Sequence, residues 1–347
     1  MNFLNKEITM KNKTIAAPSS YLYPERHLDN LLGHDWYKTI NALLSGIYIA
    51  TTEFYVKKNI QPALFPVTTG AISSPMGLGS DSQPVSVKIK GHRVYLADSM
   101  QFCLEIGARL NSVGAYYIMP TFRGEETDAR HLNEFMHSEV EIRGELNDVM
   151  ALAEAYIKYL IRYLLKHNAA HISAVAGGTE HLSNALKHKF RKLSYSRALA
   201  DLMPIEGAVR QLGRFYDITP KGEKILLQQY GDFVWLTDLP WKLVPFYQAK
   251  QEIFDECAYA ADLLAGIGEI LGCGQRVLTI EDLDASLKAH RVKPDEYQWY
   301  RRMREIECVQ TSGFGLGIER FLLWVLKHDD IRDCTILLRN HNKIVGP

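Results

Sequence analysis

The sequence predicts an α+β fold. Of its 347 residues, 47% are hydrophobic, so the chain holds enough apolar material for a sizeable core. Strand-like runs are separated by single helical segments, without the regular strand–helix–strand alternation of a doubly wound sheet. The chain contains no internal repeat, and its length allows one large domain or two smaller ones.

Helical and strand periodicities locate the main elements. Apolar residues recur at helical spacing from His34 to Lys57, and again from Asp148 to His167, where they form one amphipathic face. Residues 132–144 alternate instead between two sides, which favours a strand over a helix. One of those sides holds Phe135, His137, Glu139 and Glu141.

Less regular segments complete the expected order. Residues 168–230 are more polar and contain a basic run at 187–192, which is either a solvated helix face or a phosphate contact. In chain order, the other expected elements are a short strand near 60–66 stopped by proline, a Gly- and Pro-rich loop at 67–84, a hairpin of 85–90 and 92–97 turning at Gly91, a helix at 100–110, strands at 115–121 and 233–237, and helices at 281–290 and 317–327.

Composition excludes several classes of protein. The chain carries 40 basic and 40 acidic side chains, so nothing indicates bulk binding of nucleic acid. No apolar run reaches the ~20 residues that span a bilayer, and the N-terminus lacks the apolar stretch of a secretory signal. The five cysteines are scattered without a C-x-x-C pair, so neither a disulfide framework nor a zinc site is indicated. We therefore expect a cytoplasmic protein that does not contact membranes.

Three segments combine charge with glycine. The first, residues 120–141, holds Arg123 and Phe135 on two strand-like pieces around a charged loop. On a hairpin, the guanidinium suits a phosphate or carboxylate, and the ring suits stacking on a base. The same hairpin is equally consistent with a solvated ribbon of ion pairs.

The second segment, residues 262–276, places Glu269 in a glycine-rich apolar strand. A buried carboxylate is costly without a partner, and a divalent cation is a suitable one. The alternative is a glycine-rich bulge with an incidental glutamate. A phosphate-binding loop of the dinucleotide or P-loop kind is poorly supported, because no helix follows directly and no Gly-Lys-Ser/Thr is present.

In the third segment, residues 313–326, a glycine-rich strand leads directly into an apolar helix. Arg320 lies in the first turn of that helix, where a cation opposes the helix dipole; this arrangement suits a polyanionic ligand. The alternative is a buried structural pair of Glu319 and Arg320.

Taken in this order, the three segments resemble the catalytic core of the class II aminoacyl-tRNA synthetases, in their aspartyl/asparaginyl branch. Phe-Arg-Gly-Glu and Arg-His-Leu-Asn-Glu-Phe, within residues 122–135, are similar to motif 2 of that branch. Gly-Phe-Gly-Leu-Gly-Ile-Glu-Arg, residues 313–320, resembles motif 3, and Pro66 fits the proline of motif 1. The resemblance implies an antiparallel sheet flanked by helices.

Finer features favour the asparaginyl side of the branch. Ser-Met-Gln-Phe-Cys-Leu-Glu, residues 99–105, resembles the asparaginyl Ser-x-Gln-Leu-x-Leu-Glu, with Leu104 where the aspartyl enzymes carry lysine. Ahead of motif 3 the chain departs from the family, with Glu305 in place of the second arginine of Arg-Arg-Tyr-Gly. Only a short arm precedes motif 1, so we expect no anticodon-binding barrel. This absence and residues 73–82 resemble the archaeal asparagine synthetase-related proteins.

The resemblance implies roles for individual residues. Arg123, Glu269 and Arg320 would be catalytic: Arg123 would bridge the α-phosphate of ATP and the substrate carboxylate, Glu269 would bind Mg²⁺ between phosphates, and Arg320 would hold the γ-phosphate. Glu125 and His131 would also hold ATP, and Phe135 would stack on adenine. Gln101, Glu105 and Tyr247 would line the amino-acid pocket.

The resemblance also implies an organisation. We expect an N-terminal arm at residues 1–25 and one catalytic domain at 26–347, with a helical elaboration at about 165–230. A homodimer through motif 1 is the expected assembly.

The leading functional hypothesis is an ATP-dependent, AMP-forming ligase. It would activate an aspartate- or asparagine-like amino acid as the acyl-adenylate and transfer it to ammonia or a small amine, as in asparagine synthesis. One alternative is a truncated asparaginyl-tRNA synthetase-like paralogue that acylates tRNA or another macromolecule; tRNA is a possible but not a required partner. Another is a non-catalytic regulatory paralogue, although the retained charged residues would be costly without an ATP–Mg²⁺ ligand.

Overall fold

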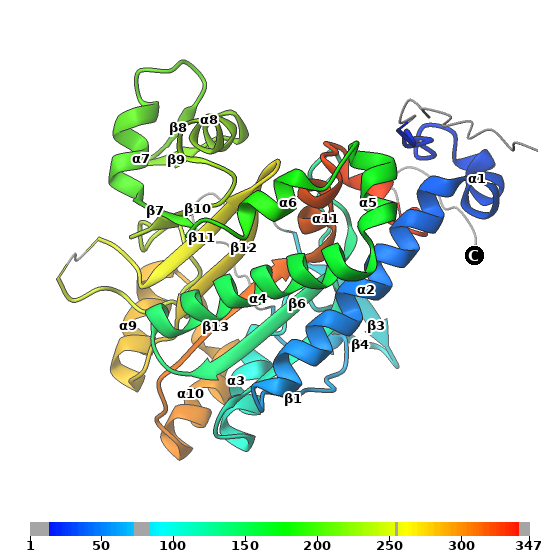
Figure 1. Ribbon diagram of the computed structural model, residues 1–347. Helices are drawn as coiled ribbons and strands as arrows, with labels where there is room; N and C mark the ends of the chain where they lie inside the picture. The colour runs from blue at the N-terminus through cyan, green and yellow to red at the C-terminus, as the bar shows by residue number, and fades with distance from the viewer. Residues whose placement is uncertain (1–13, 73–82, 254–255, 340–347) are drawn as a thin grey trace, which may run out of the picture.

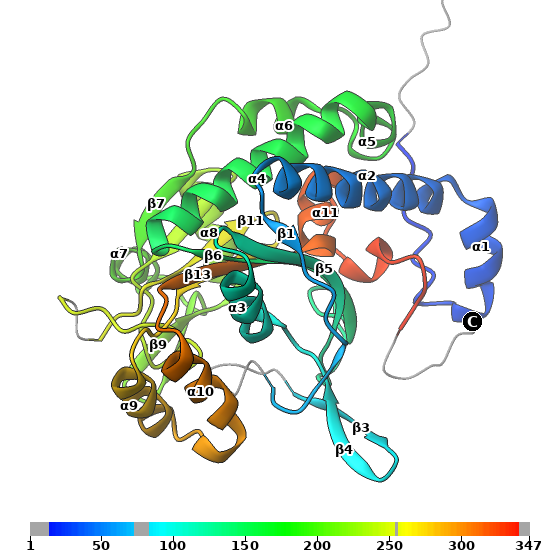
Figure 2. The same ribbon diagram turned by 90° about the horizontal axis from the view of Figure 1, so that it is seen from below.

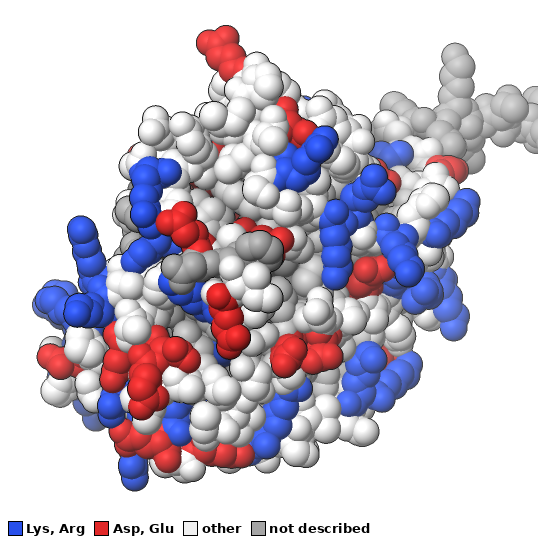
Figure 3. Space-filling view, turned by 90° about the vertical axis from the view of Figure 1, so that its left-hand side faces the viewer, with Lys and Arg blue, Asp and Glu red and all other residues white. Residues whose placement is uncertain are grey.

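A computed structural model describes residues 14–72, 83–253 and 256–339 of the chain (Figure 1). The segment 73–82 and the first half of the expected N-terminal arm lie outside the described residues. Within the described residues, no helix is both long and apolar enough to cross a bilayer. Basic and acidic side chains both occur across the face seen in Figure 3, as expected from their equal numbers in the sequence.

Eight strands form the central sheet, in the order β1-β5-β6-β13-β12-β11-β10-β7. Its six inner strands are antiparallel neighbours, whereas the two edge strands pair in parallel with theirs. The inner strands are β5 (Gly114–Phe122), β6 (Glu134–Arg143), β13 (Thr311–Gly317), β12 (Gly268–Gln275), β11 (Ala260–Ala265) and β10 (Val234–Thr237), and the edges are β1 (Gln61–Pro62) and β7 (Arg191–Ser194). This confirms the α+β class and the largely antiparallel sheet.

Helices cover both faces of this sheet (Figure 2). The long helices α2 (Asp35–Lys57) and α4 (Leu146–His167) pack on one face together with α11 (Ile318–Leu326). The main core lies between them and the sheet, where the strands contribute residues such as Val140 and Phe314. On the opposite face, α3 (Gln101–Leu110) packs on β5 and β6, with α9 (Ile280–His290) and α10 (Gln298–Ile306) nearby, and leaves part of the sheet uncovered.

The segment between motif 2 and motif 3 differs from the expected helical elaboration. It contains helices α5 (Ala169–Ala176), α6 (Glu180–Ala185), α7 (Tyr195–Leu202) and α8 (Pro220–Tyr230), but also the edge strand β7 and a hairpin of β8 (Val209–Leu212) and β9 (Phe215–Ile218). Leu202, Ile218 and Leu226 form part of a separate apolar cluster that also contains Val234 of β10 and Leu264 of β11, so this segment packs on the sheet through a second core. The basic run at 187–192 leads into β7 and is not a helix face. β7 is an edge strand of the sheet, and charged side chains suit an exposed sheet edge.

Most other expected elements are confirmed within one or two residues. The predicted hairpin is β3 (Val85–Ile89) and β4 (His92–Leu96), joined at Gly91, whose φ of +85° favours glycine. The strand expected near 60–66 is limited to the two residues of β1, and the loop that follows contains β2 (Thr68–Thr69), which pairs with β4. The remaining helix near the N-terminus is α1 (His27–Gly33).

Candidate active site

Two adjoining cavities lie on the side of the sheet opposite α2 and α4. The first, of about 460 Å³, is lined by the motif 2 and motif 3 segments. The second, of about 350 Å³, extends over β11, β12 and the segment 239–248. Arg123, His137, Glu269 and Gly315 line both cavities, so these four residues mark the place where the cavities meet.

Strand β6 supplies the side chains of this face because its residues alternate as the sequence predicts. Phe135, His137 and Glu139 point to the cavities, whereas Val140 and Ile142 belong to the main core on the other face. Strand β13 lies beside β6 in a register that pairs Gly313 with Glu141, Gly315 with Glu139 and Gly317 with His137.

The glycines of β13 leave room for these carboxylates. A Cβ atom at Gly313 would lie 1.9 Å from Oε2 of Glu141, and one at Gly315 would lie 3.0 Å from Oε1 of Glu139. Gly313 and Gly315 therefore have a steric reason, which is the close approach of the β6 side chains across the sheet.

Arg123 follows β5 directly and reaches the place where the cavities meet. Its guanidinium lies over the Phe135 ring, 5.4 Å from the ring centroid, and its Nε is buried without a hydrogen-bond partner among the described residues. No carboxylate of the described residues forms an ion pair with Arg123. A guanidinium left in this state is ready for an anionic ligand.

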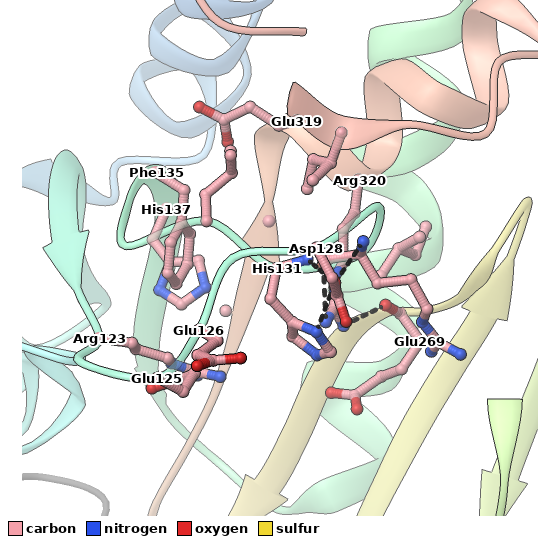
Figure 4. Close-up of a pocket in the computed structure, with 16 residues that line it drawn as sticks. Arg123, Glu125, Glu126, Asp128, His131, Phe135, His137, Glu269, Glu319 and Arg320 are labelled. Atoms are coloured by element: carbon pink, nitrogen blue, oxygen red, sulfur yellow. Dashed lines mark hydrogen bonds and ion pairs between the residues drawn. The ribbon is translucent and has the colours of Figure 1, made fainter. Parts of the chain in front are cut away.

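The loop between β5 and β6 carries the other motif 2 residues (Figure 4). Nδ1 of His131 lies 2.9 Å from Oδ1 of Asp128, and burial followed by the charge of Arg320 lowers the pKa of His131. The Glu125 carboxylate accepts a hydrogen bond from the Gln83 backbone N–H at 3.1 Å. Arg130 pairs with Glu223 of α8 at 2.5 Å, which ties this loop to the segment between motifs 2 and 3.

Arg320 and Glu319 do not form the structural pair considered as an alternative. Both Glu319 oxygens accept the Met136 backbone N–H at 3.1 Å, and burial raises the pKa of Glu319 to about 7. Arg320 points toward the first cavity and donates to the Glu269 carbonyl at 2.7 Å. Burial, and then the nearby Arg123 and Arg130, lower the pKa of Arg320, although Glu269 opposes this. Three cations near one cavity favour a polyanion.

Glu269 and Asp262 approach each other over Gly272. A Cβ atom at Gly272 would lie 3.3 Å from Oε1 of Glu269 and 3.3 Å from Oδ1 of Asp262. Burial, followed by the charges of Glu269 and Glu223, raises the pKa of Asp262 well above its ordinary value. The described residues contain no group of three side chains placed to enclose a metal ion. Two carboxylates nevertheless fit Mg²⁺, which usually takes its remaining ligands from phosphates and water.

At the base of the second cavity, Arg276 is paired with Glu141. Its Nε and Nη2 atoms contact the Glu141 carboxylate at 2.9–3.2 Å, and Nη1 donates to Oε1 of Gln248 at 2.9 Å. Burial raises the pKa of Glu141 and Arg276 opposes this, while the Glu141 charge outweighs burial and raises the pKa of Arg276, so the two side chains form an ion pair. Gln101 donates to the same carboxylate at 3.3 Å, and Tyr247 lies under the guanidinium, 5.2 Å from ring centroid to Cζ.

Glu139 lines the same cavity and is held by several donors. Ser99 Oγ donates to it at 2.7 Å and the Met100 backbone N–H at 3.0 Å, and the Tyr117 hydroxyl also donates. Burial raises the pKa of Glu139, but the contact with His137 and the hydrogen bonds of Tyr117 and Ser99 outweigh it, so its pKa lies below the ordinary value.

The predicted site residues gather here with one exception. Arg123, Glu125, His131, Phe135, Glu269 and Arg320 line the first cavity, and Gln101 and Tyr247 line the second. Glu105 is fully buried behind the second cavity, where it contacts Arg304 at 3.2 Å and accepts from the Tyr300 hydroxyl. Glu105 lies one helical turn beyond Gln101, so it supports the pocket from behind and does not line it.

Six further residues belong to the site although no role was expected for them from the sequence: Arg276, Gln248, Asp262, His137, Glu139 and Glu141. Glu139 and Glu141 carried a usable signal, since they alternate with core residues and lie two and four positions after His137. Arg276 and Gln248 carried no local signal, because only the pairing of β12 with β13 and β6 brings them to the cavity.

Comparison with known families agrees with this geometry. The family described as tRNA synthetases class II (D, K and N) matches residues 31–341. The asparagine–tRNA ligase of Thermococcus gammatolerans is 30% identical over 254 residues, which cover 72% of this chain and 58% of that protein. The asparagine–tRNA ligase of Pyrococcus abyssi is 31% identical over 350 residues, which cover 96% of this chain and 78% of that protein. This chain therefore spans only part of the length of these relatives.

Solved structures give the same result. The asparaginyl-tRNA synthetase of Pyrococcus horikoshii, complexed with asparaginyl-adenylate, superposes with a TM-score of 0.85 at 26% identity, covering 95% of this chain and 74% of that one. The Entamoeba histolytica enzyme in complex with asparaginyl-adenylate has a TM-score of 0.80 at 21% identity, covering all of this chain and 74% of that one, and supports the fold alone.

Proposed function

The chain belongs to the class II tRNA synthetases of the D, K and N type, and from this premise we propose that it is an AMP-forming ligase that activates asparagine with ATP. Its matched relatives are asparagine–tRNA ligases. The observation that carries the choice of amino acid is the pairing of Arg276 with Glu141 at the base of the second cavity.

In the first cavity, ATP would bind against the cations and the Phe135 ring. Arg320 and His131 line this cavity and suit the phosphate chain, while Glu125 and Phe135 suit the nucleoside. Arg123, where the cavities meet, would contact both the α-phosphate and the substrate carboxylate. Attack of that carboxylate on the α-phosphorus needs placement and charge neutralisation and no covalent nucleophile on the protein.

Glu269 would hold Mg²⁺, together with Asp262. Burial, followed by the charges of Glu269 and Glu223, raises the pKa of Asp262, and a cation at this position would offset both effects. When bound, the ion would supply charge neutralisation for the phosphates of ATP. We expect EDTA to abolish adenylate formation and excess Mg²⁺ to restore it.

The second cavity suits an amide side chain better than a carboxylate. The Arg276 charge is already balanced by Glu141, and Glu139, whose pKa is lowered, adds a negative charge that suits the substrate ammonium group. An aspartate side chain would bring one further negative charge without a free cation to receive it, whereas asparagine brings none. Leu104, where the aspartyl enzymes carry lysine, is buried in an apolar cluster.

For the acceptor, we propose tRNA or a related macromolecule in preference to ammonia. The matched relatives are named asparagine–tRNA ligases, and a chain that activates asparagine could not make asparagine by ammonia transfer. The asparagine synthesis hypothesis, which starts from aspartate, is therefore less well supported than its alternative.

The test is transfer from a preformed adenylate. The protein is incubated with ATP, Mg²⁺ and radiolabelled asparagine, and the complex is then mixed with unfractionated tRNA or with ammonium chloride. We expect label in acid-precipitable RNA and a strong decrease of this signal at high salt. Label transferred to ammonium alone, or a complex formed with aspartate alone, would contradict the proposal.

The homodimer remains a prediction, and an apolar surface near Pro66 supports it. Tyr48 and Val56 on α2 are 56% and 54% exposed, and Leu64, after β1, is 96% exposed. We propose that a second copy covers this surface. Light scattering should then give twice the 39.5 kDa of one chain, and Leu64→Asp should give the single mass.

A further inference from the structure

One side chain where the cavities meet has no role in the activation step. Of the four residues that line both cavities, Arg123 and Glu269 act in activation and Gly315 has no side chain. His137 is the remaining one. The acyl-adenylate joins the contents of the two cavities at their junction, so His137 lies beside the bond that is later broken.

The imidazole of His137 is held in place from two sides. The Phe135 ring contacts it edge-on, with ring centroids 4.8 Å apart (Figure 4). On another side, Nδ1 lies 3.2 Å from Oε1 of Glu139. Glu139 is itself fixed by Ser99, Tyr117 and the backbone N–H of Met100. The side chain of His137 keeps only 13% of its surface exposed, and its backbone pairs with Gly317 of β13 in the sheet.

The other ring nitrogen is open. Nε2 of His137 has no hydrogen-bond partner among the described residues and is not among the buried polar atoms, so it faces the cavities that the residue lines. Nδ1 is buried 3.2 Å from the Glu139 carboxylate and Nε2 is open to the cavities, so the ring is placed to act as a general base through Nε2.

We propose that His137 is a catalytic residue of acyl transfer, accepting the proton of the incoming acceptor; this inference rests on the proposed function. The acceptor hydroxyl or amine attacks the carbonyl carbon of the adenylate, and its proton passes to Nε2. The bond from that carbon to the phosphate oxygen breaks, and AMP leaves with the electron pair. The imidazolium then returns the proton to water.

The activation step needs no general base, because the attacking carboxylate of the amino acid is already ionised. Loss of His137 should therefore affect transfer and not activation. His137→Ala and His137→Gln are compared with His92→Ala, which removes an exposed histidine of the β4 hairpin. Adenylate formation is followed by ATP–pyrophosphate exchange. Transfer is followed in single turnovers from preformed complex to unfractionated tRNA, with ammonium chloride as a parallel acceptor.

We expect exchange to stay within about threefold of wild type in all three variants, whereas transfer falls ~10²–10⁴-fold in both His137 variants. Added imidazole should restore part of the transfer in His137→Ala, where it can occupy the vacated space, and not in His137→Gln. Unchanged transfer, or a loss of exchange equal to the loss of transfer, would overturn the inference. Absence of exchange in the wild type would instead overturn the proposed function, and with it this inference.

Discussion

Gly313→Ala tests whether the glycines of β13 exist to admit the β6 carboxylates. The new Cβ would lie 1.9 Å from Oε2 of Glu141, 2.4 Å from the Val140 carbonyl oxygen and 2.5 Å from Nε2 of Gln101. None of these can stay in place, because real Cβ atoms do not approach so closely. Glu141 would have to move, and its contacts with Arg276 at 2.9–3.2 Å would break.

The magnitude follows from three opposing effects. Separating a buried ion pair costs ~3–5 kcal/mol, and overpacking costs ~1–3 kcal/mol where the surroundings cannot relax. Alanine is otherwise favoured over glycine in a strand by ~0.5–1 kcal/mol. We expect Gly313→Ala to lower the free energy of unfolding by about 2–4 kcal/mol, since Glu141 keeps part of its pairing after a shift.

The assay is urea unfolding followed by tryptophan fluorescence, with Gly317→Ala as the matched control in the same strand. A Cβ at Gly317 would have its nearest neighbour at 3.7 Å, on Arg320, so its stability should change by less than ~0.5 kcal/mol. Equal stability of the two variants would refute the steric reason given for Gly313.

Three further predictions concern charge. Arg123→Ala should abolish exchange while changing stability by less than ~0.5 kcal/mol, since no carboxylate of the described residues pairs with it; Arg93→Ala, on the exposed hairpin, is the control, and an unfolded Arg123 variant would contradict its ligand-binding role. Glu141→Gln should reduce the preference for asparagine over aspartate by ~10–100-fold in exchange assays, because Arg276 loses its countercharge; an unchanged preference would refute the charge argument. Glu319 has a folded pKa of about 7, raised from 4.5, so its stabilising contribution is present below pH 4.5 and is lost as the pH rises through 7. Glu319→Gln should therefore gain about 3 kcal/mol relative to wild type between pH 4 and pH 8 in urea unfolding, and parallel pH profiles would exclude this assignment.

Local patterns predicted the parts of the fold that depend on local physics. The alternation of residues 132–144 gives β6 and the face of each side chain, because a strand has a period of two. Arg123 follows β5, Phe135 lies in β6, and Arg320 lies in the first turn of the helix that follows β13. These three strands are neighbours in the sheet, so the three side chains reach one cavity.

Where the structure differs from the expectation, long-range packing decided the outcome. The elaboration expected as helical at about 165–230 contains helices α5 to α8 but also β7, which pairs with β10; no local pattern in the basic run indicates that pairing. Glu105 was expected to line the amino-acid pocket. Its carboxylate is instead buried and accepts hydrogen bonds from Arg304 and Tyr300 of α10. Arg276 reaches the cavity only through the register of three strands that are distant in sequence.

The most direct measurement is ATP–pyrophosphate exchange with each of the twenty amino acids, in the presence of Mg²⁺ and without tRNA. The pairing of Arg276 with Glu141 predicts exchange with asparagine and at least ~10-fold less with aspartate. Exchange with aspartate in preference to asparagine, or with neither, would contradict the proposal that this chain is an asparagine-activating ligase.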